Sequence, residues 1–316
     1  MKSEAQHWRE EPRIAVGLLQ NASSVTIGLL DDFLDSSGRR FPAGEYQLDF
    51  GREEITGPAG RSRLDQEWQL RPVSDRGRFS LQATIGINFH WQQNEMQTFP
   101  EGLRILAPGG GRGTVINDVS LERYLQSVIC SEMNADSPAE LIKAHSIISR
   151  SWLLAQLDPA PVAGPPAPGL SDGEIVRWTD REAHATFDVC ADDHCQRYQG
   201  LGRIGNESML SKVGATRGQV LSFAGRVCDA RFSKCCGGVT EDFRLAWGDQ
   251  EVPIWFPCLT VPVLCPIRRF KTRPPCVVSS KTRLTAIATA RTRNYWQFFS
   301  IATIGRRRIF SAGSGV

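Results

Sequence analysis

The sequence lacks the hydrophobic segments that would place a chain in or across a membrane. No stretch approaches the roughly 20 apolar residues that a membrane-spanning helix needs. Residues 1–12 contain three glutamates and no apolar run, so they do not resemble a secretory signal. We therefore expect no membrane span, and export of the protein would need another route or a different translation start.

Acidic residues are missing from the last part of the chain. All 34 Asp and Glu residues lie at or before Glu251, and the 65 residues that follow contain 11 Lys or Arg. A basic arm of this kind is typical of proteins that bind nucleic acid or another anionic polymer. The aromatic run 294–301 is too apolar for such an arm. We interpret residues 259–316 as a basic, acid-free tail, favour a shifted reading frame as its origin, and expect no nucleic-acid partner.

The composition of the rest is that of a globular protein. The chain has 316 residues, 41% of them hydrophobic and 22% charged, which supports one large or two modest domains. Its nine cysteines are an odd number in a chain without a visible export signal, which argues against a disulfide framework. Metal binding or buried thiols are the better interpretations of the cysteines.

The residues that follow a disordered N-terminus over 1–12 predict a β-rich region over 13–114. Apolar residues alternate with others at Ile14, Val16 and Leu18, and again over 84–91, with the period of a strand. The glycine-rich run 109–113 lacks the Lys-Ser/Thr ending of a phosphate loop and predicts a hairpin turn.

Helical patterns begin after this region, so the expected fold class is α+β. Apolar residues at 121, 124, 125, 128 and 129 form a helical stripe. A second helix is expected from Ser137 as the cap, with Pro138 at its first position and Glu140 completing a capping box. Short strands are expected within 187–198, 219–223 and 227–232.

Three groups of residues have the types that chemistry requires. Glu132 lies between the two helices, where partial desolvation can raise the pKa of a carboxyl group and suit it to protonating a leaving oxygen; the alternative is an ordinary solvated or capping glutamate. His184, Cys190 and Cys195, with His194 as a possible fourth ligand, are a soft donor set suited to zinc. The alternative is a buried thiol beside surface histidines.

The third group combines small residues with an aromatic one. Gly237 and Gly238 follow Ser233 and precede Trp247, so backbone N–H groups could approach a ligand while the indole stacks on a sugar. The alternative is a hairpin turn with a core tryptophan.

Taken in order, these segments resemble the family of stage II sporulation protein D and the LytB amidase enhancer. The resemblance covers about residues 115–258. Its matching segments are Asn117 to Leu125, Ser131-Glu132-Met133, Lys143-Ala144 with Arg150, Cys195-Gln196-Arg197-Tyr198, Ala215-Thr216-Arg217-Gly218, and Gly237 to Glu241 with Trp247.

The resemblance implies a mixed helix and strand domain that acts on peptidoglycan glycan strands, and hence a place in the cell envelope. Active members are lytic transglycosylases, whose catalytic acid corresponds to Glu132. Some members bind zinc in the region of His184, Cys190 and Cys195, which implies a structural metal here. We expect Lys143 and Arg150 to orient Glu132 or to contact substrate, the alternative being a solvated helix face. The competing function is a non-catalytic glycan-binding module that stimulates a cell-wall amidase.

Overall fold

The chain divides into two compact units, each of which is described by itself. The computed structural model describes residues 10–58, 60–87, 90–158, 184–205, 207–223 and 226–232, and the backbone alone of residues 305–308. The β-rich unit holds described residues up to 137 and those of 184–217, and the α2 unit holds those of 138–158 and those after 217. The expected tail over 259–316 lies outside the described residues apart from 305–308.

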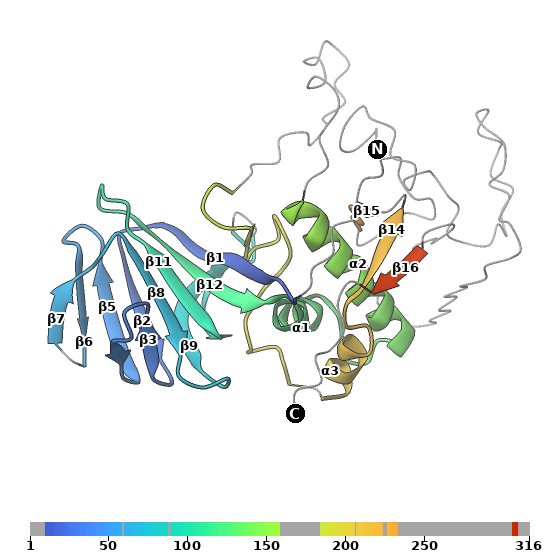
Figure 1. Cartoon of the computed structure of the whole chain (residues 1–316), viewed down its shortest axis with the longest axis horizontal. Helices are drawn as coiled ribbons and strands as arrows, with labels where there is room; N and C mark the ends of the chain where they lie inside the picture. The colour runs from blue at the N-terminus through green and yellow to red at the C-terminus, as the bar shows by residue number, and fades with distance from the viewer. Residues whose placement is uncertain are drawn as a thin grey trace, which may run out of the picture. The chain divides into compact units, whose positions relative to one another are not determined.

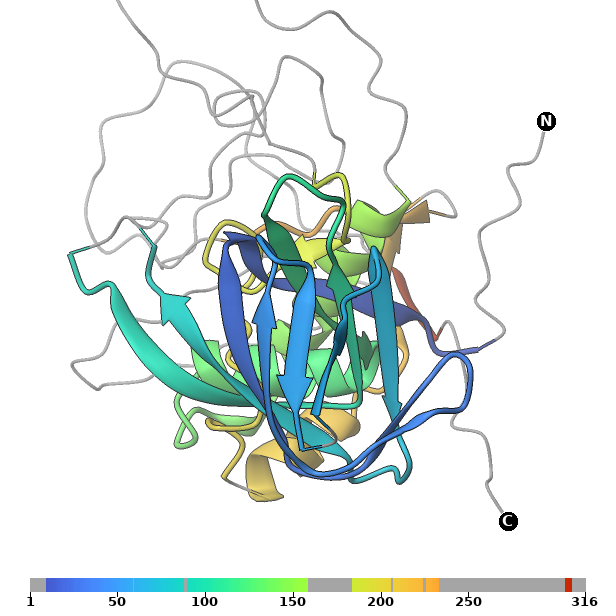
Figure 2. The ribbon, with the colours of Figure 1, turned by 90° about the vertical axis from the view of Figure 1, so that its left-hand side faces the viewer.

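Two sheets build most of the β-rich unit (Figures 1 and 2). The seven-stranded sheet has the order β13 (Val189–Cys190), β1 (Arg13–Ala22), β12 (Gly113–Ser120), β11 (Gly102–Leu106), β8 (Glu67–Pro72), β3 (Phe33–Asp35) and β4 (Arg40–Phe41). The six-stranded sheet has the order β10 (Gln93–Pro100), β9 (Arg78–Ile85), β2 (Ser24–Leu29), β5 (Gly44–Asp49), β6 (Glu54–Gly57) and β7 (Gly60–Arg63).

An aromatic core joins the two sheets. Alternate side chains of β2, β8 and β9 are buried, as expected for strands that cover a core with one face. The ring of Tyr46 on β5 lies 6.1 Å from the ring of Phe41 on β4 and 6.4 Å from that of Trp68 on β8, so it bridges the sheets. Contacts of this kind bury large apolar area and fix how the sheets pack.

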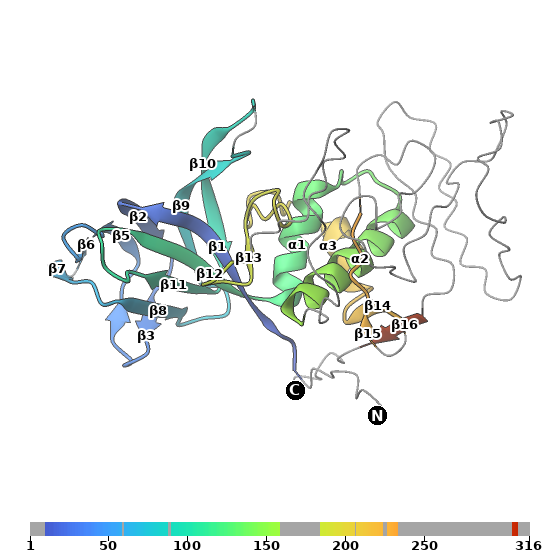
Figure 3. The same ribbon diagram turned by 90° about the horizontal axis from the view of Figure 1, so that it is seen from above.

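Strand β1 pairs with two strands, one that leads into α1 and one that belongs to the loop around residue 190. β1 pairs antiparallel with β12, which leads directly into α1 (Leu121–Glu132). On its other side β1 pairs parallel with β13, so that Gly17 lies opposite Cys190. A short helix, α3 (Glu207–Gly214), contacts α1. Figure 3 shows the loop that contains β13 running between the β9–β10 strands and α1.

The α2 unit is a helix packed on a small sheet. Helix α2 (Ala139–Leu157) contacts β14 (Gln219–Phe223) and β15 (Arg226–Val227), and β14 also pairs with β16 (Gly305–Arg308). Ile147 and Ile148 of α2 form a hydrophobic cluster with Leu221, Cys228 and Ala230. This cluster packs α2 against the segment that contains β14 and β15.

The α+β class expected from the sequence is confirmed. The glycine-rich run forms the turn between β11 and β12, with positive φ at Gly109, Gly110 and Gly111, a backbone that side chains with a Cβ rarely adopt. Helix α2 begins one residue later than expected, with Pro138 at the cap and no side-chain cap bond. The expected capping box is therefore wrong. The domain boundaries expected from the sequence stay a prediction.

Candidate functional site

Glu132 is the last residue of α1, where the chain leaves the helix. Its side chain is half-buried, and its Oε1 accepts a hydrogen bond from the backbone N–H of Arg197 at 3.3 Å. Ser131 donates from its hydroxyl to the carbonyl of Ser127 at 2.8 Å, which directs that side chain back along the helix. The carboxylate of Glu132 is thereby held against a loop that is 65 residues away in the sequence.

Two side chains hold Arg197 beside Glu132. The guanidinium of Arg197 makes a two-pronged ion pair with Asp193, with both N–O distances at 3.0 Å. It also lies over the ring of Trp91, 5.1 Å from the ring centre, as in a cation–π contact. The hydrogen bond that Arg197 donates to Asp193 raises the pKa of the guanidinium, so Arg197 stays positively charged. The Asp193–Arg197 pair fixes the loop that donates to Glu132.

Segment 195–198 of this loop contacts segment 117–125, and both segments carry the family resemblance. The hydroxyl of Tyr198 donates to Oδ1 of Asn117 at 2.5 Å, and the hydroxyl of Tyr124 donates to Oε1 of Gln196 at 3.2 Å. The rings of Tyr124 and Tyr198 are stacked with centres 5.1 Å apart. Both tyrosines are buried, and burial raises the pKa of each hydroxyl well above its usual range, so both remain donors. These contacts tie the segment 195–198 to β12 and α1.

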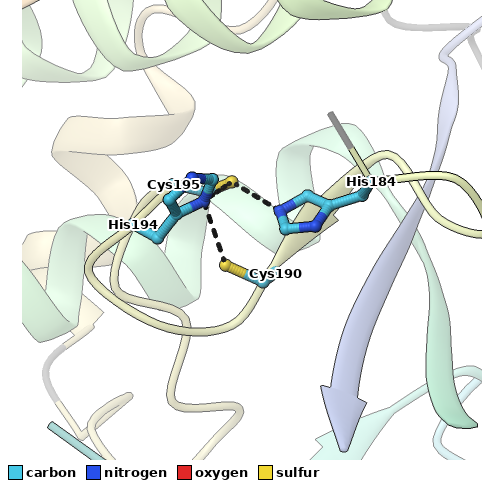
Figure 4. A group of neighbouring side chains, drawn as sticks. All are labelled: His184, Cys190, His194 and Cys195. Carbon is cyan, nitrogen blue, oxygen red and sulfur yellow. Dashed lines mark hydrogen bonds between the residues drawn. The ribbon is translucent and has the colours of Figure 1, made fainter. Parts of the chain in front are cut away.

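Four side chains from the loop around β13 point toward one another (Figure 4). The donor atoms of His184, Cys190, His194 and Cys195 all lie within 4.8 Å of one another. Nε2 of His184 lies 3.4 Å from Sγ of Cys195, and Nδ1 of His194 lies 3.4 Å from Sγ of Cys195 and 3.8 Å from Sγ of Cys190.

This arrangement resembles a tetrahedral metal site. Donors bound to zinc at about 2.0–2.3 Å lie about 3.3–3.8 Å from one another in a tetrahedron, and the three separations given above fall in that range. Two imidazoles and two thiols are the donor types that zinc prefers. The cluster could therefore hold a metal ion. His194, which the sequence suggested as a possible fourth ligand, lies with the other three donors.

Packing around Cys190 fixes one side of the cluster. Cys190 is buried with Ile116 and Phe187 against the outer face of β12. A Cβ at position 17, directly opposite Cys190 in the sheet, would come within 2.5 Å of the Phe187 ring, so only glycine fits there. The hydrogen bond with Cys195, followed by burial, raises the pKa of the Cys190 thiol. The thiol is therefore protonated at neutral pH unless a metal displaces the proton.

The two cations expected on the second helix have different surroundings within the α2 unit. Nζ of Lys143 lies 2.8 Å from Oε1 of Glu140, at a half-exposed position. The side chain of Arg150 is fully buried, and its NH1 donates to the carbonyls of Ser146 at 3.3 Å and Gln219 at 2.9 Å. Arg150 thus joins α2 to β14, and the substrate or positioning role expected for both residues stays a prediction.

The remaining expected site residues cannot be placed. Ser233, Gly237, Gly238 and Trp247 lie outside the residues that the structure describes. Conversely, the sequence assigned no role to Trp91, Asp193 or Arg197. Arg197 donates to Glu132 from the loop, and Asp193 and Trp91 contact the guanidinium of Arg197. The spacing of Asp193 and Arg197 by four residues is the only local signal for their pairing.

Comparison with known proteins gives a family and a distant relative. The model of the family described as Stage II sporulation protein, SpoIID, matches residues 110–223. An uncharacterized protein of Brachyspira hyodysenteriae is 25% identical over 134 residues, which are 42% of this chain and 30% of that protein. The chain thus spans less than a third of the length of this curated relative.

The family match indicates the general area of function. Among the described residues, no helix is both long enough and apolar enough to cross a membrane. The SpoIID family implies a function related to the cell wall. The match spans Glu132, the four His and Cys donors that could hold a metal ion, and the contacts of Tyr124 and Tyr198. The chain therefore carries a domain of the SpoIID/LytB family over residues 110–223.

Proposed function

We propose that this protein is a lytic transglycosylase that cleaves peptidoglycan glycan strands stripped of their stem peptides, with Glu132 as the catalytic residue. The observation that carries the proposal is the position of Glu132 within the family match. It ends α1, is half-buried, and is held by the N–H of Arg197 at 3.3 Å. A carboxyl group that is oriented by a fixed donor can meet a substrate in a defined geometry.

One carboxyl group is sufficient for this reaction. Glu132 first donates its proton to the glycosidic oxygen, and the bond from that oxygen to C1 breaks. The carboxylate then takes the proton of the sugar's own 6-hydroxyl as its oxygen bonds to C1. The products are a 1,6-anhydro end and a free hydroxyl, and Glu132 recovers its proton. No water is consumed, so the second carboxylate of an ordinary glycosidase is not required.

We propose further that the donors at 184, 190, 194 and 195 hold zinc as a structural ion. Four protein donors fill a tetrahedral site, which leaves no position for a catalytic water. The ion would fix the loop that continues through Gln196, Arg197 and Tyr198 to the contact with Glu132. The chain's own residues would perform the proton transfers.

The test is the variant Glu132→Gln, which keeps the shape of the side chain and removes its transferable proton. Incubation of wild-type protein with stripped strands should yield 1,6-anhydro ends that mass spectrometry detects. Glu132→Gln should lower the rate by about 10²–10⁴-fold, the usual contribution of general acid–base catalysis. Glu45→Gln, which alters an exposed glutamate of β5, is the matched control and should retain the rate.

The outcomes separate the proposal from its alternative. Cleavage that survives Glu132→Gln would contradict the assigned mechanism. Wild-type protein that binds strands, yields no anhydro ends and stimulates a purified cell-wall amidase would instead identify a non-catalytic enhancer.

A further inference from the structure

A hollow with many charged residues in its lining lies on the β-rich unit, and its lining includes neither Glu132 nor the four His and Cys donors. Its volume is about 670 Å³, within the range of small-molecule sites. Its floor is the outward face of β8, β11 and β12, three adjacent strands in Figure 1. Gly102 lies at the centre of this floor, opposite Asp118, and a Cβ there would meet the Asp118 carbonyl at 3.0 Å. The missing side chain leaves the backbone of the floor open.

Three of the four acidic groups that line the hollow are engaged by neighbouring residues. Glu101 adopts a positive φ of 63°, and its carboxylate accepts from the backbone N–H and the hydroxyl of Ser120 at 3.0 and 2.7 Å. Arg13 forms ion pairs with Glu101 at 3.0 Å and with Asp118 at 3.1 Å. Asp35, at the rim, accepts from Ser37 in its own turn. These carboxylates therefore offer little attraction to a cation.

Two arginines on the floor make fewer polar contacts than these carboxylates do. Arg104 is opposite Gln69 in the sheet, and its side chain is 25% exposed. Its Nε is buried without a hydrogen-bond partner among the described residues, and its NH1 lies 3.9 Å from Oε1 of Glu67. Arg71, two residues after Gln69, is exposed and forms no ion pair within the described part of the chain. A buried donor without a partner is costly, and a bound acceptor would remove that cost.

We propose that this hollow binds a saccharide that carries one carboxylate, with Arg104 and Arg71 as the residues that bind the carboxylate. The planar guanidinium matches a carboxylate in a two-pronged geometry. Gln69, Ser74 and Asp75 offer donors and acceptors for sugar hydroxyl and amide groups around the same hollow. The balance of four arginines and four acids in the lining favours a ligand with a single charge over a polyanion.

The identity of the saccharide rests on the proposed function. A glycan strand stripped of its stem peptides exposes the lactyl carboxylate to which each peptide was joined by an amide. A hollow that recognises this carboxylate would distinguish stripped strands from peptide-bearing ones at a place remote from the bond that is cut. Glu132 takes no part in this recognition.

Calorimetry with the full chain at low salt tests the proposal. The probes are N-acetylmuramic acid and its methylamide, in which the carboxylate is neutralised, together with inorganic phosphate. We expect the acid to bind at least tenfold more tightly than either of the other two. Arg71→Gln, at an exposed position that should not disturb folding, should weaken binding of the acid by about tenfold. Arg104→Gln should weaken it at least as much.

Two controls decide the interpretation. Arg61→Gln changes an exposed arginine on the edge strand β7 and should leave binding unchanged. Glu132→Gln should also leave it unchanged, so failure of cleavage and failure of this site are separate results. The site is wrong if the acid does not bind, if its methylamide binds equally, if phosphate binds equally, or if Arg61→Gln weakens binding as much as Arg71→Gln.

Discussion

The two units of the chain use buried polar groups in opposite ways. In the β-rich unit, Glu132 is half-buried and meets a loop whose arginine is held by Asp193 and Trp91. In the α2 unit, Arg150 is fully buried and donates to backbone carbonyls of its own helix and of β14. The first arrangement holds a carboxylate at a contact between a helix end and a loop, whereas the second joins a helix to a strand. A charged residue in a family motif can therefore lie at a partly open contact or be buried in packing, and its contacts distinguish the two.

The largest effect should come from loss of the proposed zinc ion in the β-rich unit. Cys195→Ser, or treatment of zinc-loaded protein with a chelator, should lower the free energy of unfolding by ~3–5 kcal/mol, less than the ~10–16 kcal/mol of isolated zinc peptides because this unit has a core of its own. Thermal unfolding with and without chelator measures the change. Hydrogen exchange should show the loss in the β-rich unit alone.

A second cysteine provides the control for that experiment. Cys130 lies in α1 outside the cluster, and burial raises the pKa of its thiol to about 11. Cys130→Ser should leave the metal content unchanged. If elemental analysis finds no metal in protein that never met a chelator, the proposed zinc site is wrong.

Arg150→Met should destabilise the α2 unit by about 1–3 kcal/mol, because the variant removes the side-chain donor that joins α2 to the carbonyl of Gln219 on β14. Denaturant unfolding followed by hydrogen exchange of β14 would measure it. A stable variant that has lost glycan cleavage would contradict the packing role and favour the substrate role expected from the sequence.

A smaller effect is expected where the loop meets Glu132. Asp193→Asn removes the charge that anchors Arg197. Because the pair is partly exposed, the loss of interaction free energy should be about 1 kcal/mol or less. We expect this to appear as a lower kcat for glycan cleavage, up to about fivefold, with KM and the melting temperature nearly unchanged. Arg203→Gln, which breaks the 3.6 Å ion pair with Glu95, is the matched control. An equal loss of rate in both variants would argue against a specific role for Asp193.

The smallest effect is expected at Lys143. Its contact with Glu140 is a surface ion pair between residues three apart on α2, so Lys143→Met should change stability by less than about 0.5 kcal/mol. Binding of glycan strands should be measured for both the Lys143→Met and the Arg150→Met variants, so that the two residues can be compared directly. Unchanged stability together with a large loss of glycan affinity would establish Lys143 as a substrate-binding residue.

Local patterns in the sequence determined much of the fold. The alternation around Ile14 and Val16 predicts β1, and the stripe from 121 to 129 predicts α1, because each pattern depends only on residues that are close in the chain. The short helix α3 was missed, since Met209 and Val213 give a single pair of apolar residues at helical spacing. The start of α2 was misplaced by one residue because a favourable cap residue need not be used.

The sequence by itself also determined which donors could form a metal cluster, since their types and close spacing are local properties. Only the tertiary structure decided that His194 joins the other three, because β13 must pair with β1 before the donors converge. The same holds for the contact of Glu132 with Arg197 and for the burial of Arg150 against β14. These contacts join residues 65 and 69 positions apart, and such contacts depend on how the elements pack, which no local pattern specifies.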